Sequence, residues 1–327
     1  MKIVHSNILL GILFSLYIGD GLQLHAQQQP GHYLQQPGSY EMILGDVKIT
    51  ALSDGSINQE LKKLLINITD EEIDHLTSEN FQTDENEASV NAYLFRLDGK
   101  LMMVDAGTSD LYGPSLGFLP QNLRKAGYDP LQIDIILITH IHTDHTGGLM
   151  DGDKMVFPNA TIYVNKTELD YWTSDDVYQN APADKKKYFV EAREKILPYL
   201  KSGKIKTFEF GEELFPGLTP LSAVGHTPGH TIYELISDNE KLVFWGDLLH
   251  AAAVQFPNPD VTIVYDIDQE QAAITRKEAF ADAARNKYWI AADHISFPGI
   301  GHIKSDGKKS YRWYPINYTT NPTGKGQ

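Results

Sequence analysis

The chain has 327 residues, no cysteine, and 43 acidic against 28 basic residues, which gives a formal net charge of −15. A chain of this length can bury one large hydrophobic core, and the lack of cysteine excludes disulfide cross-links. The negative charge argues against a nucleic-acid partner, because acidic surfaces repel phosphate backbones. The fold must therefore depend on its core and on any metal ions that it binds.

The N-terminus carries the features of a secretory signal peptide. A lysine at position 2 precedes an apolar run over residues 8–18, and Ala26 precedes a polar tract. This order is typical of a leader removed after export, and the apolar run is too short for a comfortable membrane span. We expect residues 1–26 to be cleaved and residues 27–327 to form a single-domain periplasmic or secreted protein with no stable membrane anchor. An uncleaved anchor is the alternative.

Strand and helix signals alternate along the rest of the chain. Residues 27–45 are rich in Gln, Gly, Pro and Tyr, which predicts a loosely ordered tail. A strand over 47–52 is expected to turn at Asp54-Gly55, and residues 91–105 have the pattern of a hairpin. Short hairpins between the helices predict mixed sheets rather than a doubly wound parallel sheet. The other predicted strands are 133–139, 161–164, 205–210, 221–224, 241–245 and 288–292, and the predicted helices are 120–127, 183–200 and 268–286.

The sequence Thr-His-Ile-His-Thr-Asp-His over 139–145 is the most informative motif. Imidazole and carboxylate groups are the ligands that zinc and similar divalent metals prefer. Neighbouring residues point different ways, so these side chains cannot all reach one ion. His140 and His142 share a side and can bind one metal, whereas Asp144 and His145 lie beyond the turn and can face a second. The motif predicts a two-metal site.

Most of the remaining histidines also follow apolar, strand-like runs. Histidines placed for structural reasons alone would not be expected to group in this way, although core or surface imidazoles without a metal are the alternative. The three groups are His140, His142 and His145; His226, His230 and His250; and His294 and His302.

The second group begins with Gly-His-Thr-Pro-Gly-His over 225–230. The Pro-Gly pair predicts a tight turn directly after a strand, which fixes the direction of His226. His226 is therefore the expected third imidazole of the first metal. His230 is expected to support the site rather than to bind, because three imidazoles and a shared carboxylate nearly fill a metal's coordination sphere.

Asp247 follows a buried strand at Gly246-Asp247, and its two carboxylate oxygens could bridge two metals. An ordinary turn aspartate is the alternative. His294 also ends a strand, and it would complete the second metal with Asp144, His145 and the shared Asp247. For His250 and His302, a place in the substrate pocket and a supporting role both stay open.

The order HxHxDH, GHTPGH, GD and strand-terminal His over residues 45–305 resembles the metallo-β-lactamase superfamily. The resemblance implies an α+β fold, a four-layer αββα sandwich of two mixed β-sheets flanked by helices, with the metals at one edge. It implies two divalent ions per chain, for which zinc is expected, although manganese, cobalt or iron also suit such ligands. The implied ligands are His140, His142, His226 and Asp247 on the first metal, and Asp144, His145, His294 and Asp247 on the second.

Three segments, 246–256, 296–302 and 311–313, resemble more closely the methyl parathion hydrolase branch, which is related to exported N-acyl-homoserine lactone lactonases. That resemblance implies a pocket with an aromatic wall. The chain departs from many lactone-cleaving members, which carry a tyrosine three residues after the bridging aspartate, where His250 stands here. The candidate pocket residues are Tyr112, Trp172, Phe189, His250 and His302, of which the three aromatics could instead be ordinary core residues.

Together these features predict a dinuclear metal-dependent hydrolase. A metal-bridging hydroxide held beside Asp144 and Asp247 would attack an ester, with His250 as a candidate helper. The expected substrate is a small-molecule lactone, foremost an N-acyl-homoserine lactone, whose cleavage would quench quorum sensing. A methyl parathion-like phosphotriesterase or an arylesterase is the alternative. A β-lactamase, an iron-dependent redox enzyme and a non-catalytic binding protein are less favoured, and a homodimer stays open.

Overall fold

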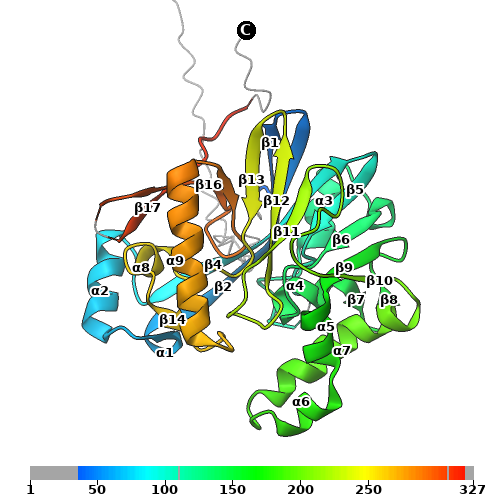
Figure 1. The fold of residues 1–327 in the computed structure, drawn as a ribbon, viewed down its shortest axis with the longest axis horizontal. Helices are drawn as coiled ribbons and strands as arrows, with labels where there is room; N and C mark the ends of the chain where they lie inside the picture. The colour runs from blue at the N-terminus through cyan, green and yellow to red at the C-terminus, as the bar shows by residue number, and fades with distance from the viewer. Residues whose placement is uncertain (1–35, 110, 308, 321–327) are drawn as a thin grey trace, which may run out of the picture. The chain divides into compact units, whose positions relative to one another are not determined.

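The computed structural model describes residues 36–109, 111–307 and 309–320, and the described chain from Pro37 onward belongs to one compact unit. The expected signal peptide and residues 27–35 of the expected tail lie outside the described residues. The unit is built on two mixed β-sheets with helices on their outer faces (Figure 1). In the described part of the chain, no helix is long and apolar enough to cross a membrane.

The first sheet has seven strands. Its first three strand pairs, from β1 to β5, are antiparallel, and the three pairs from β5 to β10 are parallel. β6 is short and completely buried, so the motif that follows it starts from a rigid point inside the fold. In spatial order the strands are β1 (Ser39–Leu44), β2 (Val47–Glu60), β4 (Glu85–Leu97), β5 (Lys100–Val104), β6 (Ile135–Leu137), β9 (Thr161–Asn165) and β10 (Ile205–Phe208).

The second sheet has six strands and is also mixed. β13 and β15 are parallel, and every other pair is antiparallel. Two further short pairs, β14 (Thr262–Ile263) with β3 (Leu65–Ile66) and β7 (Met150–Asp151) with β8 (Lys154–Met155), lie outside the main sheets. The strands of the second sheet, in order, are β11 (Leu218–Ser222), β12 (Thr231–Ser237), β13 (Glu240–Phe244), β15 (Trp289–Ala291), β16 (Ile300–Ser305) and β17 (Tyr311–Pro315).

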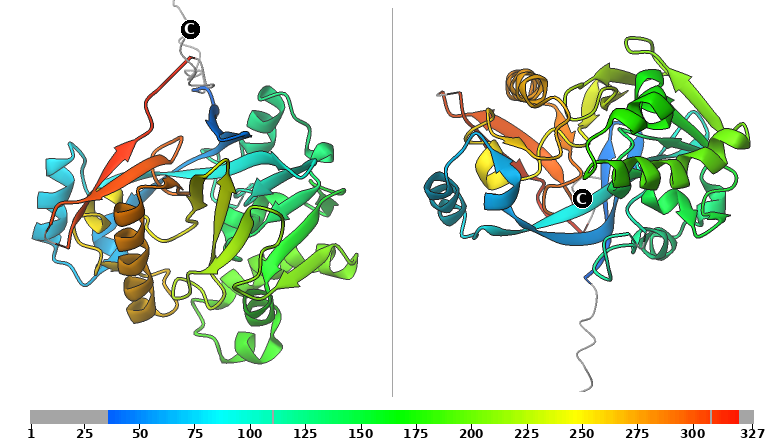
Figure 2. Two further views of the ribbon diagram at one scale, coloured as in Figure 1. Left: turned by 45° about the horizontal axis from the view of Figure 1, so that its top comes forward. Right: turned by 90° about the horizontal axis from the view of Figure 1, so that it is seen from below.

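The two sheets face each other across a shared core, as shown by buried side chains of both sheets in one hydrophobic cluster, such as Phe95 of β4 and Phe244 of β13. These two rings stack with their centroids 5.5 Å apart. Helices α3, α5 and α7 cover the outer face of the first sheet, and α9 covers that of the second. Figure 2 shows α9, in orange, well separated from the green helices α5 and α7 in both views. The expected αββα sandwich is confirmed.

Local sequence explains where the longer helices begin. Thr69 caps α2 and Glu72 returns a bond to the Thr69 backbone, whereas the side chains of Asn165 and Asp268 cap α5 and α9. Such caps satisfy amide groups that a helix leaves unpaired. The helices are α1 (Leu61–Leu64), α2 (Asp70–Glu79), α3 (Leu119–Lys125), α4 (Thr143–Thr146), α5 (Lys166–Thr173), α6 (Asp175–Asn180), α7 (Lys186–Lys201), α8 (Ala252–Gln255) and α9 (Gln269–Asn286).

Two predictions about the first strands are wrong. Residues 39–44 of the expected tail form β1, which pairs along its full length with β2. The chain does not turn at Asp54-Gly55 but continues in β2 through a bulge. The Asp54 carboxylate accepts hydrogen bonds from backbone N–H groups of Thr108, Gly117 and Leu119, so it ties the bulged strand to a neighbouring loop. A bulge bends a strand without ending its pairing.

Candidate metal centre

The candidate ligands come from loops that follow strands of both sheets. Residues 139–146 leave β6 and enter α4, and His226 lies between β11 and β12. Asp247 follows β13 through Gly246, whose φ of 53° is a left-handed conformation that glycine adopts without strain. His294 follows β15. The buried strand ends therefore bring distant parts of the sequence to one place.

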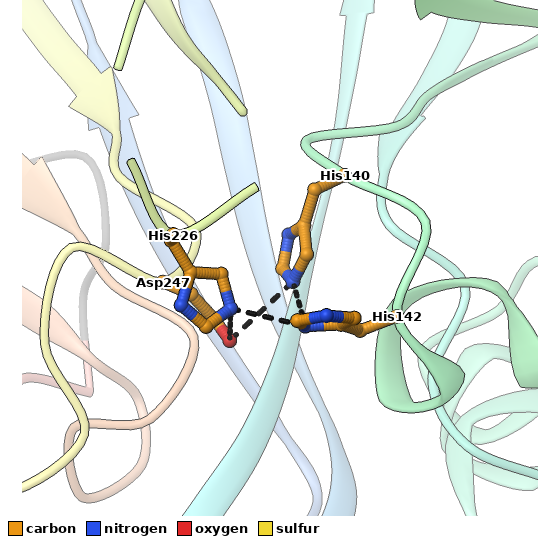
Figure 3. A group of neighbouring side chains, drawn as sticks. All are labelled: His140, His142, His226 and Asp247. Atoms are coloured by element: carbon orange, nitrogen blue, oxygen red, sulfur yellow. Dashed lines mark hydrogen bonds and ion pairs between the residues drawn. The ribbon is translucent and has the colours of Figure 1, made fainter. Parts of the chain in front are cut away.

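The first group consists of His140, His142, His226 and Asp247 (Figure 3). His142 Nδ1 lies 3.0 Å from both His140 Nε2 and His226 Nε2. Asp247 Oδ2 lies 3.2 Å from His226 Nε2 and 3.5 Å from His140 Nε2. Four ligands of one tetrahedral zinc ion are spaced about 3.3 Å apart. The spacing and the donor types therefore fit one divalent ion.

The second group consists of Asp144, His145 and His294, which face the other oxygen of Asp247. Asp247 Oδ1 lies 3.1 Å from the Nε2 atoms of both His145 and His294. Asp144 Oδ2 lies 3.3 Å from His294 Nε2. His145 Nε2, His294 Nε2 and Asp247 Oδ1 are buried without a hydrogen-bond partner in the described chain. Buried polar atoms that converge without partners fit a second ion, for which Asp247 would be the shared ligand.

In the first group, hydrogen bonds from the far side of the ring set the tautomers of His140 and His226. His140 Nδ1 lies 3.0 Å from Thr139 Oγ1, which in turn donates to Asp105 Oδ2 at 2.6 Å. His226 Nδ1 lies 2.7 Å from Asp266 Oδ1. A proton on Nδ1 leaves Nε2 unprotonated and facing the group, which is the form that binds a metal.

The second group has the same kind of support from carboxylates and backbone. His145 Nδ1 lies 2.8 Å from Asp105 Oδ2 and 3.2 Å from Asp293 Oδ2. His294 Nδ1 donates to the backbone carbonyl of Ser89 at 2.9 Å. Asp105, His145 and Asp293 also lie close enough to be a ligand cluster of their own. Because His145 Nδ1 already binds both carboxylates, we interpret this cluster as support for the second group.

The two ligand groups differ in the pKa values of their imidazoles. Burial lowers the pKa of His140 and His142 well below the usual imidazole value, and neighbouring imidazoles add to this effect. Burial also opposes protonation of His145 and His294, but nearby carboxylates, chiefly Asp247, outweigh it and raise the pKa of both rings well above the usual value. The second group therefore holds protons more strongly when no metal is bound.

His230 does not belong to either group of candidate ligands. Its Nδ1 donates to the Ala223 carbonyl at 2.9 Å, and its Nε2 accepts from the Asp247 backbone N–H at 3.1 Å. Burial lowers the pKa of His230 to about 3, so the ring is neutral and both nitrogens are occupied. The ring holds the Asp247 backbone in place, as the prediction of a supporting role requires.

A cavity of about 720 Å³ opens over the centre. The candidate pocket residues Tyr112, Trp172, Phe189 and His250 all line it. The rings of Trp172 and Phe189 are tilted against each other with their centroids 4.8 Å apart. Both side chains are also buried in the hydrophobic core on the outer face of the first sheet. These two aromatics therefore both line the cavity and pack in the core.

His250 faces the centre from the cavity. Its Nε2 lies 3.0 Å from Asp247 Oδ2, and its Nδ1 is buried without a hydrogen-bond partner in the described chain. Burial lowers its pKa, so the neutral ring donates one hydrogen bond to Asp247. Its nitrogen is also within reach of a ligand cluster with Asp247 and His294, so His250 lies at the junction of both groups.

The prediction that His302 lines the pocket is wrong. His302 lies on β16, where its Nδ1 donates to the Tyr288 carbonyl at 3.0 Å and its ring packs on Trp289 with centroids 3.9 Å apart. The ring is not among the residues that line the cavity. It follows a strand-like run as the other histidines do, but it is part of a strand rather than of a loop at the strand's end.

Several residues of the site were missed by sequence reasoning. Each is an ordinary acidic or aromatic residue whose partners are distant in sequence, so no local motif marks it. Tyr265 lines the cavity beside His250, and burial raises its pKa to about 12, so its hydroxyl stays protonated. The carboxylates that hold the ligand loops are those of Asp105, Asp266 and Glu168.

Fold and site together define a class: an αββα sandwich with two ligand groups that share one carboxylate at the ends of the strands. A family model described as the metallo-beta-lactamase superfamily matches residues 86–290. The chain belongs to the metallo-β-lactamase superfamily, and two divalent metals per chain fit its ligand groups.

Comparison with solved structures and curated proteins shows which members of the superfamily this chain is similar to. The hydrolase AbOPH of the β-lactamase superfamily has a TM-score of 0.83 and 36% identity, and the match covers 87% of this chain and 99% of that one. AidC, a dizinc quorum-quenching lactonase in complex with the product N-hexnoyl-L-homoserine, has a TM-score of 0.81 and 29% identity, with 86% and 99% covered. The N-acyl homoserine lactonase AiiA of Bacillus thuringiensis subsp. kurstaki is 32% identical over 108 residues, which are 33% of this chain and 35% of that protein. The chain thus spans about a third of that curated relative.

Proposed function

We propose that this protein is a metal-dependent hydrolase that opens the ring of N-acyl-homoserine lactones. The observation that carries the proposal is the position of Asp247, whose two oxygens face two complete groups of ligands at the base of a largely apolar cavity. The likeness to the dizinc lactonase AidC over 99% of its chain supports a lactone as substrate.

The ligand assignment is part of the proposal. His140, His142, His226 and Asp247 would hold one ion, and Asp144, His145, His294 and Asp247 the other. Two bound divalent ions supply Lewis-acid polarisation of an ester carbonyl and lower the pKa of water toward neutrality. We propose zinc as the ion, because the first group presents three imidazole nitrogens and one carboxylate oxygen.

The protein's own residues would orient the substrate and manage its charges. Burial opposes ionisation of Asp144, but His145 and His294 hold the pKa of Asp144 well below its usual range, so it stays a carboxylate in the centre. The single N–H of the neutral His250 ring donates to Asp247 in this structure and could instead donate to a substrate oxygen placed beside it. This position fits the role of the tyrosine that many lactonases carry.

The cavity wall suits an acyl chain. Trp172 and Phe189 present aromatic rings on one side, and Val264 and Ile267 present aliphatic groups from the segment after β14. Apolar surface removed from water contributes about 25 cal/mol per Å² to binding. A linear acyl chain lying along this wall would therefore bind better than a small polar group.

The first test is hydrolysis by the purified, metal-loaded protein of a panel of substrates. The panel holds long- and short-chain acyl-homoserine lactones, a simple aryl ester, a methyl phosphotriester and a cephalosporin, and kcat/KM is measured for each. We expect the lactones to be preferred by about a hundredfold or more, equivalent to about 2.7 kcal/mol of transition-state discrimination. A preference for the phosphotriester would replace the lactonase proposal and leave the ligand assignment standing.

Export is a second part of the proposal. The lysine, apolar run and Ala26 of the N-terminus support a signal peptide over residues 1–26, followed by a single hydrolase domain over residues 27–327. An acyl-homoserine lactone is a diffusible extracellular molecule, which an exported enzyme would meet. The intact mass of the protein recovered from periplasm or medium tests this: we expect a chain that begins after Ala26, and a full-length chain in the membrane fraction would contradict it.

A further inference from the structure

Glu168 is a completely buried acidic residue in the first turn of α5. Burying a carboxylate is costly unless hydrogen bonds replace its water. Glu168 is not a member of any of the ligand groups found in the described chain. Its burial therefore calls for another explanation.

Four donors surround this carboxylate. Oε1 accepts from the Ile141 backbone N–H at 2.8 Å and from Trp172 Nε1–H at 2.7 Å. Oε2 accepts from Thr227 Oγ1–H at 2.7 Å and from the Gly229 backbone N–H at 2.8 Å. Hydrogen bonds to a charged acceptor are about twice as strong as those between neutral groups. The side chain is thus fully used as a fourfold acceptor.

Three of the four donors belong to the two segments that carry the imidazoles of the first ligand group. Ile141 stands between His140 and His142, and Thr227 directly follows His226. These segments leave different sheets, and a single carboxylate holds both. Gly229 approaches so closely that a Cβ there would lie 2.5 Å from the Glu168 backbone nitrogen, so α5 and this loop are packed without a gap.

The fourth donor connects the same carboxylate to the cavity wall. The Trp172 ring meets His142 edge to face, with centroids 5.4 Å apart, and packs on Phe189. The bond to Glu168 fixes the indole in this orientation. A change at Glu168 therefore reaches the metal ligands and the pocket together.

We propose that Glu168 is a positioning residue that clamps the two loops of the first metal, and the cavity-lining Trp172, into one rigid unit. It acts through Ile141, Thr227 and Gly229 without touching a ligand atom. Residues that orient metal ligands in this way typically contribute about 10- to 100-fold to metal affinity or activity.

Glutamine cannot replace this side chain, although its shape is nearly the same. An amide has one acceptor oxygen and one NH₂ donor, whereas donors face both oxygens of Glu168. In either orientation an NH₂ group would face a buried backbone N–H, that of Ile141 or that of Gly229. Glu168→Gln is therefore the sharpest substitution, because it changes the hydrogen bonds and keeps the volume.

The test measures Co²⁺ affinity by chelator competition and by the visible spectrum of the bound ion. It is done in the otherwise unchanged chain and in a His294→Ala background, which leaves only the first ligand group complete. We expect Glu168→Gln to weaken Co²⁺ binding to the first group about 10- to 100-fold. The matched control is Glu234→Gln, because Glu234 lies on β12 and pairs with Lys241 away from the ligand loops; it should bind Co²⁺ normally.

Two further variants keep the carboxylate and remove one donor each. Thr227→Val removes the hydroxyl beside His226 and should weaken Co²⁺ binding roughly tenfold, the lower end of the same range. Trp172→Phe removes only the indole donor from the clamp, so it should leave Co²⁺ affinity nearly unchanged and raise KM. Weaker Co²⁺ binding in one variant and a higher KM in the other would show that Glu168 holds the metal loops and the cavity wall through separate hydrogen bonds.

A folded Glu168→Gln protein with a lower Tm but normal Co²⁺ affinity would overturn the proposal, because Glu168 would then serve packing alone. If Glu168→Gln does not fold, Thr227→Val decides: normal Co²⁺ affinity in that variant would equally overturn it. The readout that decides is Co²⁺ affinity, which does not depend on which ester is hydrolysed. Failure of the lactonase proposal is therefore distinguishable from failure of this one.

Discussion

The two ligand groups share Asp247 but differ in what surrounds them. In the first group, His140 and His142 lie among other imidazoles, and burial keeps both rings neutral. In the second, His145 and His294 lie among carboxylates that favour their protonated forms. Before any metal binds, only His226 of the first group must release a proton, whereas both imidazoles of the second group must do so.

This difference indicates an order of binding. The first group resembles a preformed site, clamped by Glu168 and by the hydrogen bond from His226 to Asp266. The second depends more on the charge of the ion, because a divalent cation replaces protons among several buried acids. Buried like charges are tolerated only when cations compensate them.

The largest effect should come from breaking the shared ligand. Asp247→Ala removes an oxygen from both groups, so we expect fewer than one metal per chain and a fall in kcat/KM of about 1,000-fold or more, since metal ions stabilise transition-state charge by several kcal/mol. Metal content by mass spectrometry and steady-state kinetics check this. Asp260→Ala, which alters an exposed aspartate paired with Lys277, is the control. Two retained metals would remove Asp247 from the ligand set.

His142→Ala should affect the first group alone. Because His142 Nδ1 contacts both other imidazoles of that group, we expect loss of one metal per chain and a fall in kcat/KM of roughly 100- to 1,000-fold. The matched control is His302→Ala, since His302 packs on Trp289 outside the cavity. Full turnover of His142→Ala with two bound metals would refute the assignment.

Lowering the pH should release the metal ions of the two ligand groups at different pH values. The raised pKa of His145 and His294 means that both rings are protonated at neutral pH without metal, so protons compete more strongly with the second ion as pH falls. In the first group His140 and His142 are neutral there, and only His226, whose pKa is raised to about 9 mainly by bonds to two carboxylates that outweigh its burial, releases a proton. Between about pH 8 and pH 6 we expect the second ion to be lost first.

Metal content after equilibration with a weak chelator at each pH measures this loss. The Co²⁺ spectrum shows which group still holds its ion, with the His294→Ala protein as the reference for the first group alone. Simultaneous loss of both ions would show that the shared Asp247, rather than the separate imidazoles, controls occupancy.

The smallest effect is expected at the cavity rim. Tyr112 lines the cavity but is 38% exposed, so Tyr112→Ala should raise KM for long-chain lactones about fivefold, through about 1 kcal/mol of lost apolar contact, with kcat and metal content unchanged. Tyr314→Ala, which alters a similarly exposed tyrosine on β17, is the control. A fall in kcat instead would place Tyr112 in the chemistry.

Much of the centre could be predicted from sequence, because its ligands are tied to local features. A buried strand end fixes the backbone of residues 139–145, and the Pro-Gly turn fixes His226. Spacing alone was enough to divide His140 and His142 from Asp144 and His145. The αββα fold followed from the family resemblance, whereas the alternation of strands, hairpins and helices predicted only mixed sheets.

The errors came where partners distant in sequence decide the outcome. Asp54 has the local signature of a turn, but bonds to a loop some 54 to 65 residues away keep β2 extended. His250 and His302 had equal standing in the sequence, and only packing places one over Asp247 and the other on Trp289.

The sequence by itself determined which residues are able to bind metal and in which order they occur along the chain. This was possible because backbone geometry at the end of a strand is a local property. The tertiary structure alone decided which buried carboxylates hold those ligands and which helices wall the cavity. Glu168 illustrates the reason: its four donors come from three separate segments, which meet only when both sheets and α5 have packed.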